Sequence, residues 1–163
     1  MNGAGGIALV TGAGSGIGRA SALALADAGW TLVLAGRRAE PLEEVAQAIR
    51  ARGGEALPVP SDVSDEESVD ALFKEVQRLY GRLDLLFNNA GLFSPAVLLE
   101  DLSYGQWRQM VDVNLSGVFL CTRAAVLMML KQQSGSIINI SSIAGLGGFY
   151  PGLSRLCVNY SAS

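Results

Sequence analysis

One stretch of the sequence decides the fold: Ile7-Ala8-Leu9-Val10-Thr11-Gly12-Ala13-Gly14-Ser15-Gly16-Ile17-Gly18. The apolar run at its start, residues 7–10, is long enough for a buried strand and too short for a helix. From residue 17 to residue 28 apolar side chains recur at three- and four-residue steps, which predicts a helix. A strand, a glycine-rich turn and a helix in this order are typical of a site for a dinucleotide pyrophosphate. The glycines let the phosphates approach the backbone, and the helix N-terminus offers unpaired N–H groups.

The residues after this unit indicate which dinucleotide fits. A second apolar strand at residues 31–35 follows Gly29, which suits the end of a helix. The next residues, Gly36-Arg37-Arg38, fall where such folds contact the adenosine ribose. They include no acidic residue that could accept a 2′-hydroxyl, whereas the guanidinium fork of arginine suits a 2′-phosphate. The sequence therefore favours NADP, with NAD as the alternative and a turn that binds no nucleotide as the remaining interpretation.

The rest of the chain continues the alternation of strands and helices. We expect further strands at residues 56–60, 83–87 and 136–141, and the prolines of the first favour an edge position. Ser64 and Glu67 resemble a capping box for a helix that ends near Gly81. A long helical stretch over residues 103–133 has an expected interruption near residues 112–114, and residues 145–163 read as loop. This pattern predicts one α/β domain over residues 1–163: a doubly wound, Rossmann-like parallel sheet with strand order 3-2-1-4-5.

Composition narrows the class of protein. Of 163 residues, 50% are hydrophobic and 17% are charged, which is ample for a buried core. A net charge of −3, with no run of more than two basic residues, argues against a nucleic-acid partner. The absence of histidine and the presence of only Cys121 and Cys157 argue against a zinc site and a disulfide framework. We expect no bound metal and chemically inert cysteines, and we interpret Asp84 as a solvated or capping carboxylate.

Two further observations bear on localisation. The longest apolar region, residues 118–130, is too short to span a bilayer and is interrupted by Thr122 and Arg123. No signal peptide is evident at the N-terminus. The sequence therefore predicts a cytoplasmic protein that does not enter a membrane.

The glycine spacing Thr-Gly-x-x-x-Gly-x-Gly at residues 11–18 resembles that of the short-chain dehydrogenase/reductase family. The motif Asn88-Asn89-Ala90-Gly91, which follows the fourth expected strand, is similar to a second motif of that family, and the resemblance covers the whole chain. It implies an oxidoreductase that interconverts an alcohol and a ketone or aldehyde of small size. It also implies a homo-oligomer, either a dimer or a tetramer, in which the apolar helix after Asn114 packs against its copy.

The resemblance also assigns site residues. Asn114 corresponds to the asparagine that holds a water in the proton relay, Ser142 to the catalytic serine, and Tyr160 to the catalytic tyrosine. A serine hydroxyl can polarise a carbonyl. A tyrosine, whose unperturbed pKa is near 10, can exchange the proton more readily when a cation lowers that pKa. The residues implied to bind the cofactor are Gly12, Ser15, Gly16, Ile17, Gly18, Arg37, Asp62, Val63, Asn89, Ala90 and Gly91.

The chain departs from the family pattern in three ways. The family's lysine follows the tyrosine by four residues, and that position lies beyond Ser163. The segment between Ser142 and Tyr160 is longer than usual, which makes Tyr150 a rival candidate, and Ser15 stands where many NADP-preferring members carry a basic residue. Members run to roughly 250 residues. We therefore expect a truncated or incomplete chain with very low activity by itself, and the alternative is a non-catalytic dinucleotide-binding module.

Overall fold

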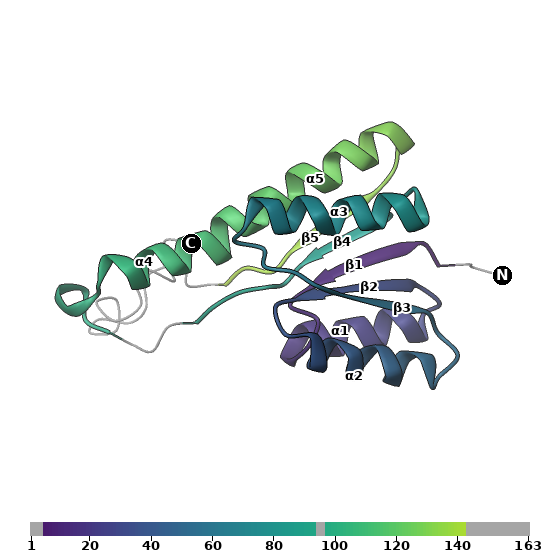
Figure 1. The fold of residues 1–163 in the computed structure, drawn as a ribbon, viewed down its shortest axis with the longest axis horizontal. Helices are drawn as coiled ribbons and strands as arrows, with labels where there is room; N and C mark the ends of the chain where they lie inside the picture. Colours follow the sequence, from purple (N-terminus) through teal and green to yellow (C-terminus); the bar gives the residue numbers. More distant parts are fainter. Residues whose placement is uncertain (1–4, 94–96, 143–163) are drawn as a thin grey trace.

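The computed structural model describes residues 5–93 and 97–142 of the chain. They form a five-stranded parallel sheet in the order β3-β2-β1-β4-β5, with helices on both faces (Figure 1). The doubly wound fold and the strand order predicted from the sequence are thus confirmed. In chain order the elements are β1 (Ile7–Thr11), α1 (Gly16–Asp27), β2 (Thr31–Gly36), α2 (Ala39–Arg50), β3 (Ala56–Pro60), α3 (Glu66–Tyr80), β4 (Leu85–Asn88), a 3-10 turn (Leu99–Asp101), α4 (Tyr104–Val111), a π-helical turn (Asp112–Ser116), α5 (Gly117–Gln132) and β5 (Ser136–Asn139).

The sheet separates two hydrophobic cores. Helices α1 and α2 cover one face, and α3 and α5 cover the other (Figure 1). Alternate residues of β1 serve opposite cores: Ala8 and Val10 pack toward α1 and α2, whereas Leu9 packs toward α3 and α5. Because both faces are covered, the central strands need apolar residues at every position, which explains why β1 reads as a continuous apolar run.

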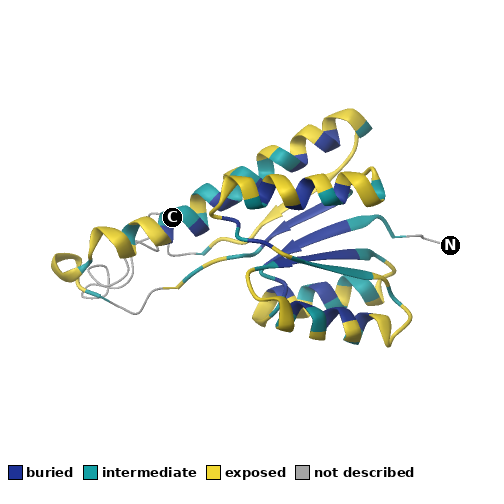
Figure 2. Cartoon of the chain, viewed as in Figure 1, coloured by how far each residue is buried: buried dark blue, intermediate teal, exposed yellow. Residues whose placement is uncertain are grey.

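The two outer strands differ from the buried centre. In β3, Pro58 and Pro60 lie opposite Leu34 and Gly36 of β2, and the outer side of the strand has no partner strand in the described residues, so its edge position is confirmed. β5 ends at Asn139, two residues earlier than predicted, and forms the opposite edge. Most of β5 is exposed, in contrast to the buried β1 and β4 (Figure 2).

The start of α3 differs from the prediction of a capping box at Ser64. The N-cap is Asp65, whose carboxylate accepts a hydrogen bond from the backbone N–H of Glu67 at 3.1 Å. Ser64 instead donates its hydroxyl to Asp62 Oδ1 at 2.7 Å and its backbone N–H to the same oxygen at 3.0 Å. The Ser64 side chain is therefore committed to Asp62, and the next residue takes over the cap.

The long helix over residues 104–132 is continuous but not uniform. Its predicted interruption is present as the π-helical turn Asp112–Ser116 between α4 and α5. By length and composition alone this 29-residue helix could cross a membrane, contrary to the expectation from residues 118–130. One face of α5, however, contributes Cys121, Ala125 and Met128 to the core beside α3, as a core helix of the domain does. The π-helical turn is also where Asn114 is placed.

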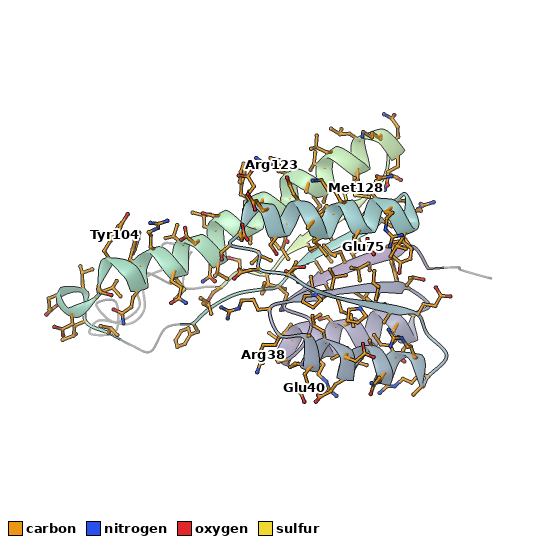
Figure 3. The ribbon with its side chains drawn as sticks, viewed as in Figure 1. Arg38, Glu40, Glu75, Tyr104, Arg123 and Met128 are labelled. Atoms are coloured by element: carbon orange, nitrogen blue, oxygen red, sulfur yellow. The ribbon has the colours of Figure 1, made fainter. Side chains whose placement is uncertain are left out.

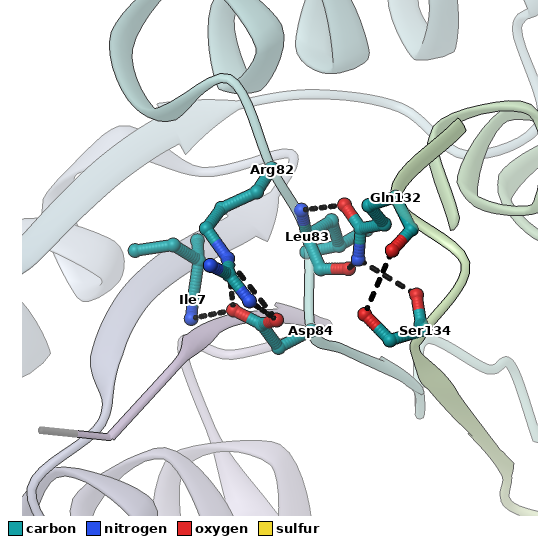
Figure 4. A network of polar contacts seen from close by, with 6 residues as sticks. All are labelled: Ile7, Arg82, Leu83, Asp84, Gln132 and Ser134. Atoms are coloured by element: carbon teal, nitrogen blue, oxygen red, sulfur yellow. Dashed lines mark hydrogen bonds and ion pairs between the residues drawn. The ribbon is translucent and has the colours of Figure 1, made fainter. Parts of the chain in front are cut away.

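A polar network ties together the amino ends of β1 and β4 and the end of α5 (Figure 4). Asp84 accepts hydrogen bonds from the backbone N–H of Ile7 at 2.8 Å and from the Arg82 guanidinium at 2.6 Å. The side chain of Gln132 bonds both the N–H and the carbonyl of Leu83. Asp84 is therefore a structural carboxylate that caps the first N–H of β1 and joins it to the start of β4; of the two predicted roles, the solvated one is wrong and the capping one is confirmed.

Candidate functional site

A cavity of about 620 Å³ lies at the carboxyl ends of the strands. This volume is within the range of pockets that take small ligands, and the carboxyl end of an open parallel sheet is where such folds bind them. The cavity walls come from the turns after β1, β2, β3 and β4. Ten of the eleven residues expected to bind cofactor line it: Gly12, Ser15, Gly16, Ile17, Arg37, Asp62, Val63, Asn89, Ala90 and Gly91.

The turn between β1 and α1 forms an open cradle. Gly12 and Gly16 have φ angles of +66° and +52°, a conformation that favours glycine. A Cβ atom at Gly16 would meet no atom within 4 Å, so the space at the N-terminus of α1 is free for a ligand. Ser15 is the N-cap residue, yet its side chain makes no capping hydrogen bond. The first N–H groups of α1 are therefore not capped by a side chain. They remain free to donate hydrogen bonds to an anionic group in the cavity.

Gly18 is the one expected cofactor residue that does not line the cavity. It is buried in the first turn of α1, and a Cβ atom there would overlap the carbonyl oxygen of Gly12 and lie 2.5 Å from Nδ2 of Asn89. Its role is therefore to let the helix approach the turn and the β4 loop. The third glycine of the motif supports the shape of the cradle from behind.

Thr11 joins the cradle to the loop after β4. Its hydroxyl oxygen accepts hydrogen bonds from the backbone N–H groups of Asn89 and Ala90, each at 3.0 Å. In return, the side-chain amide of Asn89 donates to the carbonyl oxygen of Thr11 at 3.0 Å. Thr11 is the first residue of the glycine motif, and no role at the site is predicted for it from the sequence. The structure shows that it fixes two walls of the cavity relative to each other.

Asn88 has a structural role in the same region. Its side chain is buried, and its amide donates to Thr122 Oγ1 at 3.1 Å and to Asn139 Oδ1 at 2.9 Å. These bonds join β4 to α5 and β5. They orient the end of β5, which leads to Ser142 three residues later.

The side of the cavity formed by the turns after β2 and β3 carries the charged groups. Arg37 and Arg38 follow β2 and are both exposed, and Figure 3 shows Arg38 at the beginning of α2. Within residues 5–93 and 97–142, Arg37 forms no ion pair. The hydrogen bond from the Ser64 hydroxyl lowers the pKa of Asp62, and the nearby charge of Arg37 lowers it further. Asp62 is thus a carboxylate at neutral pH, and the Arg37 guanidinium is available to an anion.

Of the three residues expected to carry catalysis, the structure describes Asn114 and Ser142 but not Tyr160. Asn114 does not line the cavity; its side-chain oxygen accepts from the N–H of Leu92 at 2.7 Å, and its Nδ2 donates to the Leu92 carbonyl at 3.0 Å. It therefore holds the segment after Gly91 in place. Ser142 is half-buried just beyond β5. Tyr160, with its rival Tyr150, lies outside the described residues.

Eight residues of the cavity wall lie outside the set predicted to bind the cofactor, and two of them are apolar residues beyond β4. Leu92 and Val113 line the cavity, the first beyond Gly91 and the second in the π-helical turn. Val113 directly precedes Asn114, so the spacing around that asparagine was the available signal. Apolar side chains at this position can cover the flat face of a base or a nicotinamide ring, which the polar cradle does not do.

Comparison with known proteins agrees with the fold. A family model described as short chain dehydrogenase matches residues 6–163. The chain belongs to the short-chain dehydrogenase family. It is 44% identical over 158 residues to a 3-oxoacyl-[acyl-carrier-protein] reductase of Synechocystis, and the match covers 96% of this chain and 62% of that protein. It is 43% identical over 143 residues to a 3beta-hydroxysteroid dehydrogenase of Mediterraneibacter gnavus, covering 88% of this chain and 51% of the relative.

A solved structure shows the same fold. The crystal structure of a 3-ketoacyl-ACP reductase from Sinorhizobium meliloti superposes with a TM-score of 0.89 at 38% identity. The match covers 96% of this chain and 60% of that one. The chain of this family member thus spans about three fifths of the protein whose structure it matches.

Proposed function

We propose that this chain forms the NADP-binding part of an oxidoreductase that interconverts an alcohol and a ketone or aldehyde. The observation that carries the proposal is the combination of an open glycine cradle with Arg37, which forms no ion pair within residues 5–93 and 97–142. Gly12 and Gly16 leave room for a pyrophosphate at the N-terminus of α1, and Arg37 offers a guanidinium fork at the adenosine side. NAD, which lacks the 2′-phosphate, would leave that guanidinium without a phosphate to bind.

The residues of this chain fit such a cofactor group by group. Gly12, Ser15 and Gly16 would hold the pyrophosphate, and Arg37 the 2′-phosphate. Asp62 and Val63 would border the adenine, while Asn89, Ala90 and Gly91 would line the path toward the nicotinamide. When bound, the nicotinamide supplies or accepts the hydride.

The proton chemistry would fall to side chains of the chain itself. The Ser142 hydroxyl would donate a hydrogen bond to the substrate oxygen and so stabilise charge that develops on it. The Tyr160 phenol would give a proton to that oxygen in reduction and take it back in oxidation. Asn114, held by Leu92, would support a water in the relay. These assignments rest on the family resemblance together with the position of Asn114 beside the cavity.

We further propose a small-molecule substrate, a cytoplasmic setting and assembly into a homo-oligomer. Assembly is supported by large apolar side chains that are exposed on the long helix: Leu115 in the π-helical turn, and Phe119, Leu127 and Leu130 in α5. Exposed apolar side chains grouped on one helix are typical of an interface. Sedimentation of the purified chain should give the mass of a dimer or tetramer, and a monomer that persists at high protein concentration would contradict this part.

The cofactor proposal is tested by titrating the purified chain with NADPH and NADH and following nicotinamide fluorescence and thermal melting. Because a ligand that binds only the folded state stabilises it, saturation at a hundredfold Kd should add about 2.7 kcal/mol. Arg37→Asp should weaken the binding of NADPH and leave the affinity for NADH nearly unchanged. Arg78→Asp, the same charge change on the exposed face of α3, is the control.

Three results would count against the proposal. No stabilisation by either nucleotide would refute cofactor binding by this chain. Tighter binding of NADH than NADPH would refute the NADP assignment alone. Cofactor binding without turnover of any carbonyl substrate, in a chain extended through a lysine four residues after Tyr160, would favour the non-catalytic module.

A further inference from the structure

A second, smaller hollow adjoins the adenosine side of the cavity. It has a volume of about 330 Å³ and lies between the turn after β3 and one face of α4. We call it the α4 hollow. Arg37, Asp62 and Val113 line both spaces, so the α4 hollow is a continuation of the cavity and not a separate site. The residues that only the α4 hollow adds include Arg108 and Asp112, one helical turn apart.

The charged side chains around the α4 hollow differ in how strongly other residues bind them. Asp62 is engaged by the hydroxyl and the N–H of Ser64, at 2.7 and 3.0 Å. Arg108, by contrast, has one ion-pair partner among the described residues, Asp112, at 3.6 Å between Nε and Oδ2. This distance is too long for a hydrogen bond, and 67% of the Arg108 side chain is exposed. An exposed pair within one helix contributes little and gives way readily to a stronger anion.

We propose that Arg108 is a specificity-determining residue that contacts the 2′-phosphate of NADP together with Arg37. The inference rests on the proposed function. Arg37, directly after β2, and Arg108, in α4, both line the same hollow, so an anion bound in it is within the surroundings of two arginine side chains. A phosphate monoester carries close to two negative charges at pH 7, more than one arginine neutralises. NAD has a neutral hydroxyl at that position and gains nothing from the second arginine.

The same geometry gives Asp112 an opposing role. Its carboxylate competes with the phosphate for Arg108, and it adds a negative charge to the hollow. Removing that charge while keeping the size of the side chain should free Arg108. Arg108→Gln and Asp112→Asn should therefore change the affinity for a 2′-phosphate in opposite directions.

The test uses two probes that report only on the adenosine side, 2′,5′-ADP and 5′-AMP, titrated into the purified chain by calorimetry. We expect Arg108→Gln to weaken the binding of 2′,5′-ADP by roughly three- to tenfold, because one charge-assisted contact at an exposed site is lost. Asp112→Asn should tighten it, and 5′-AMP should bind both variants as it binds the original chain. Arg78→Gln is the matched control, because Arg78 is equally exposed and also pairs within its own helix.

The outcomes separate the inference from the proposed function. If 2′,5′-ADP binds, is lost on Arg37→Asp and is unaffected by Arg108→Gln, the inference fails while the proposed function stands. If Arg78→Gln weakens the probe as much as Arg108→Gln, the effect is general surface charge and the inference is wrong. If NADPH itself does not bind, the proposed function fails and the inference fails with it. Far-ultraviolet circular dichroism confirms that each variant is folded.

Discussion

Gly117 of α5 lies directly against Val63 in the cavity wall: a Cβ atom at residue 117 would sit 2.9 Å from Cγ2 and 3.1 Å from the backbone oxygen of Val63. This contact brings the long helix against the turn after β3. It therefore connects the packing of α5 with the cavity wall that the turn after β3 forms.

The contact predicts opposite effects for two helical glycines. Gly117→Ala should lower the free energy of unfolding by about 1–3 kcal/mol from overpacking, less the roughly 1 kcal/mol by which alanine favours a helix. Gly105→Ala in α4 meets nothing within 4 Å and should raise it by about 0.5–1 kcal/mol. Urea unfolding followed by circular dichroism measures both. Equal effects from the two substitutions would refute the packing argument.

The glycines of the cradle should divide into one that supports folding and one that supports binding. Gly18→Ala places a methyl group against Gly12 and Asn89, so we expect a clear loss of stability, of about 1–3 kcal/mol. Gly16→Ala has open space around it and should cost only the strain of a positive φ, about 1–2 kcal/mol, yet it should abolish NADPH binding by filling the cradle. Melting curves with and without NADPH distinguish the two. Full NADPH binding by a folded Gly16→Ala variant would contradict the assignment.

Asp84 predicts how stability depends on pH. The hydrogen bond from Arg82, assisted by that from the N–H of Ile7, lowers the pKa of Asp84 below its ordinary value of 3.8. A lowered pKa in the folded state contributes stability that is present above about pH 4 and is lost as the pH falls through the folded-state pKa. Asp84→Asn should cost about 1–2 kcal/mol at pH 7 and reduce the loss of stability as the pH falls below about 4, which urea unfolding over a series of acidic pH values measures.

Glu75 provides the control for that measurement. It also pairs with an arginine, Arg78, and its pKa is also lowered, but the pair lies on the exposed surface of α3 (Figure 3 labels Glu75). Because solvent screens such a pair, Glu75→Gln should leave the pH profile nearly unchanged. If Glu75→Gln and Asp84→Asn alter the profile equally, the link between β1 and β4 is not what sets it.

Cys121 should be unreactive while the chain is folded. The thiol is fully buried in the core beside α3, and burial raises its pKa to about 12. Because the thiolate is the reactive form, iodoacetamide at pH 8 should modify Cys121 only after unfolding. Mass spectrometry of a Cys157→Ser variant, with and without urea, measures this. Rapid modification without urea would show that α5 opens away from the sheet.

The sequence by itself was sufficient for the layers and order of the sheet. Continuous apolar runs such as residues 7–10 indicate strands covered on both faces, and right-handed crossovers then allow few orders. The cradle was equally readable, because the glycines at residues 12 and 16 are needed wherever a phosphate approaches a positive-φ turn. Pro58 and Pro60 placed β3 at an edge, since proline cannot donate to a neighbouring strand.

The tertiary structure alone decided which polar groups meet across long separations in the chain. Asp84 reaches Ile7, Thr11 bonds Asn89, and Arg108 borders the same hollow as Arg37. No local pattern carries these partners, because a hydrogen bond depends on distances of tenths of an ångström that packing of the helices on the sheet sets. Local sequence thus determined the elements and the cradle, and packing determined the charges that surround it.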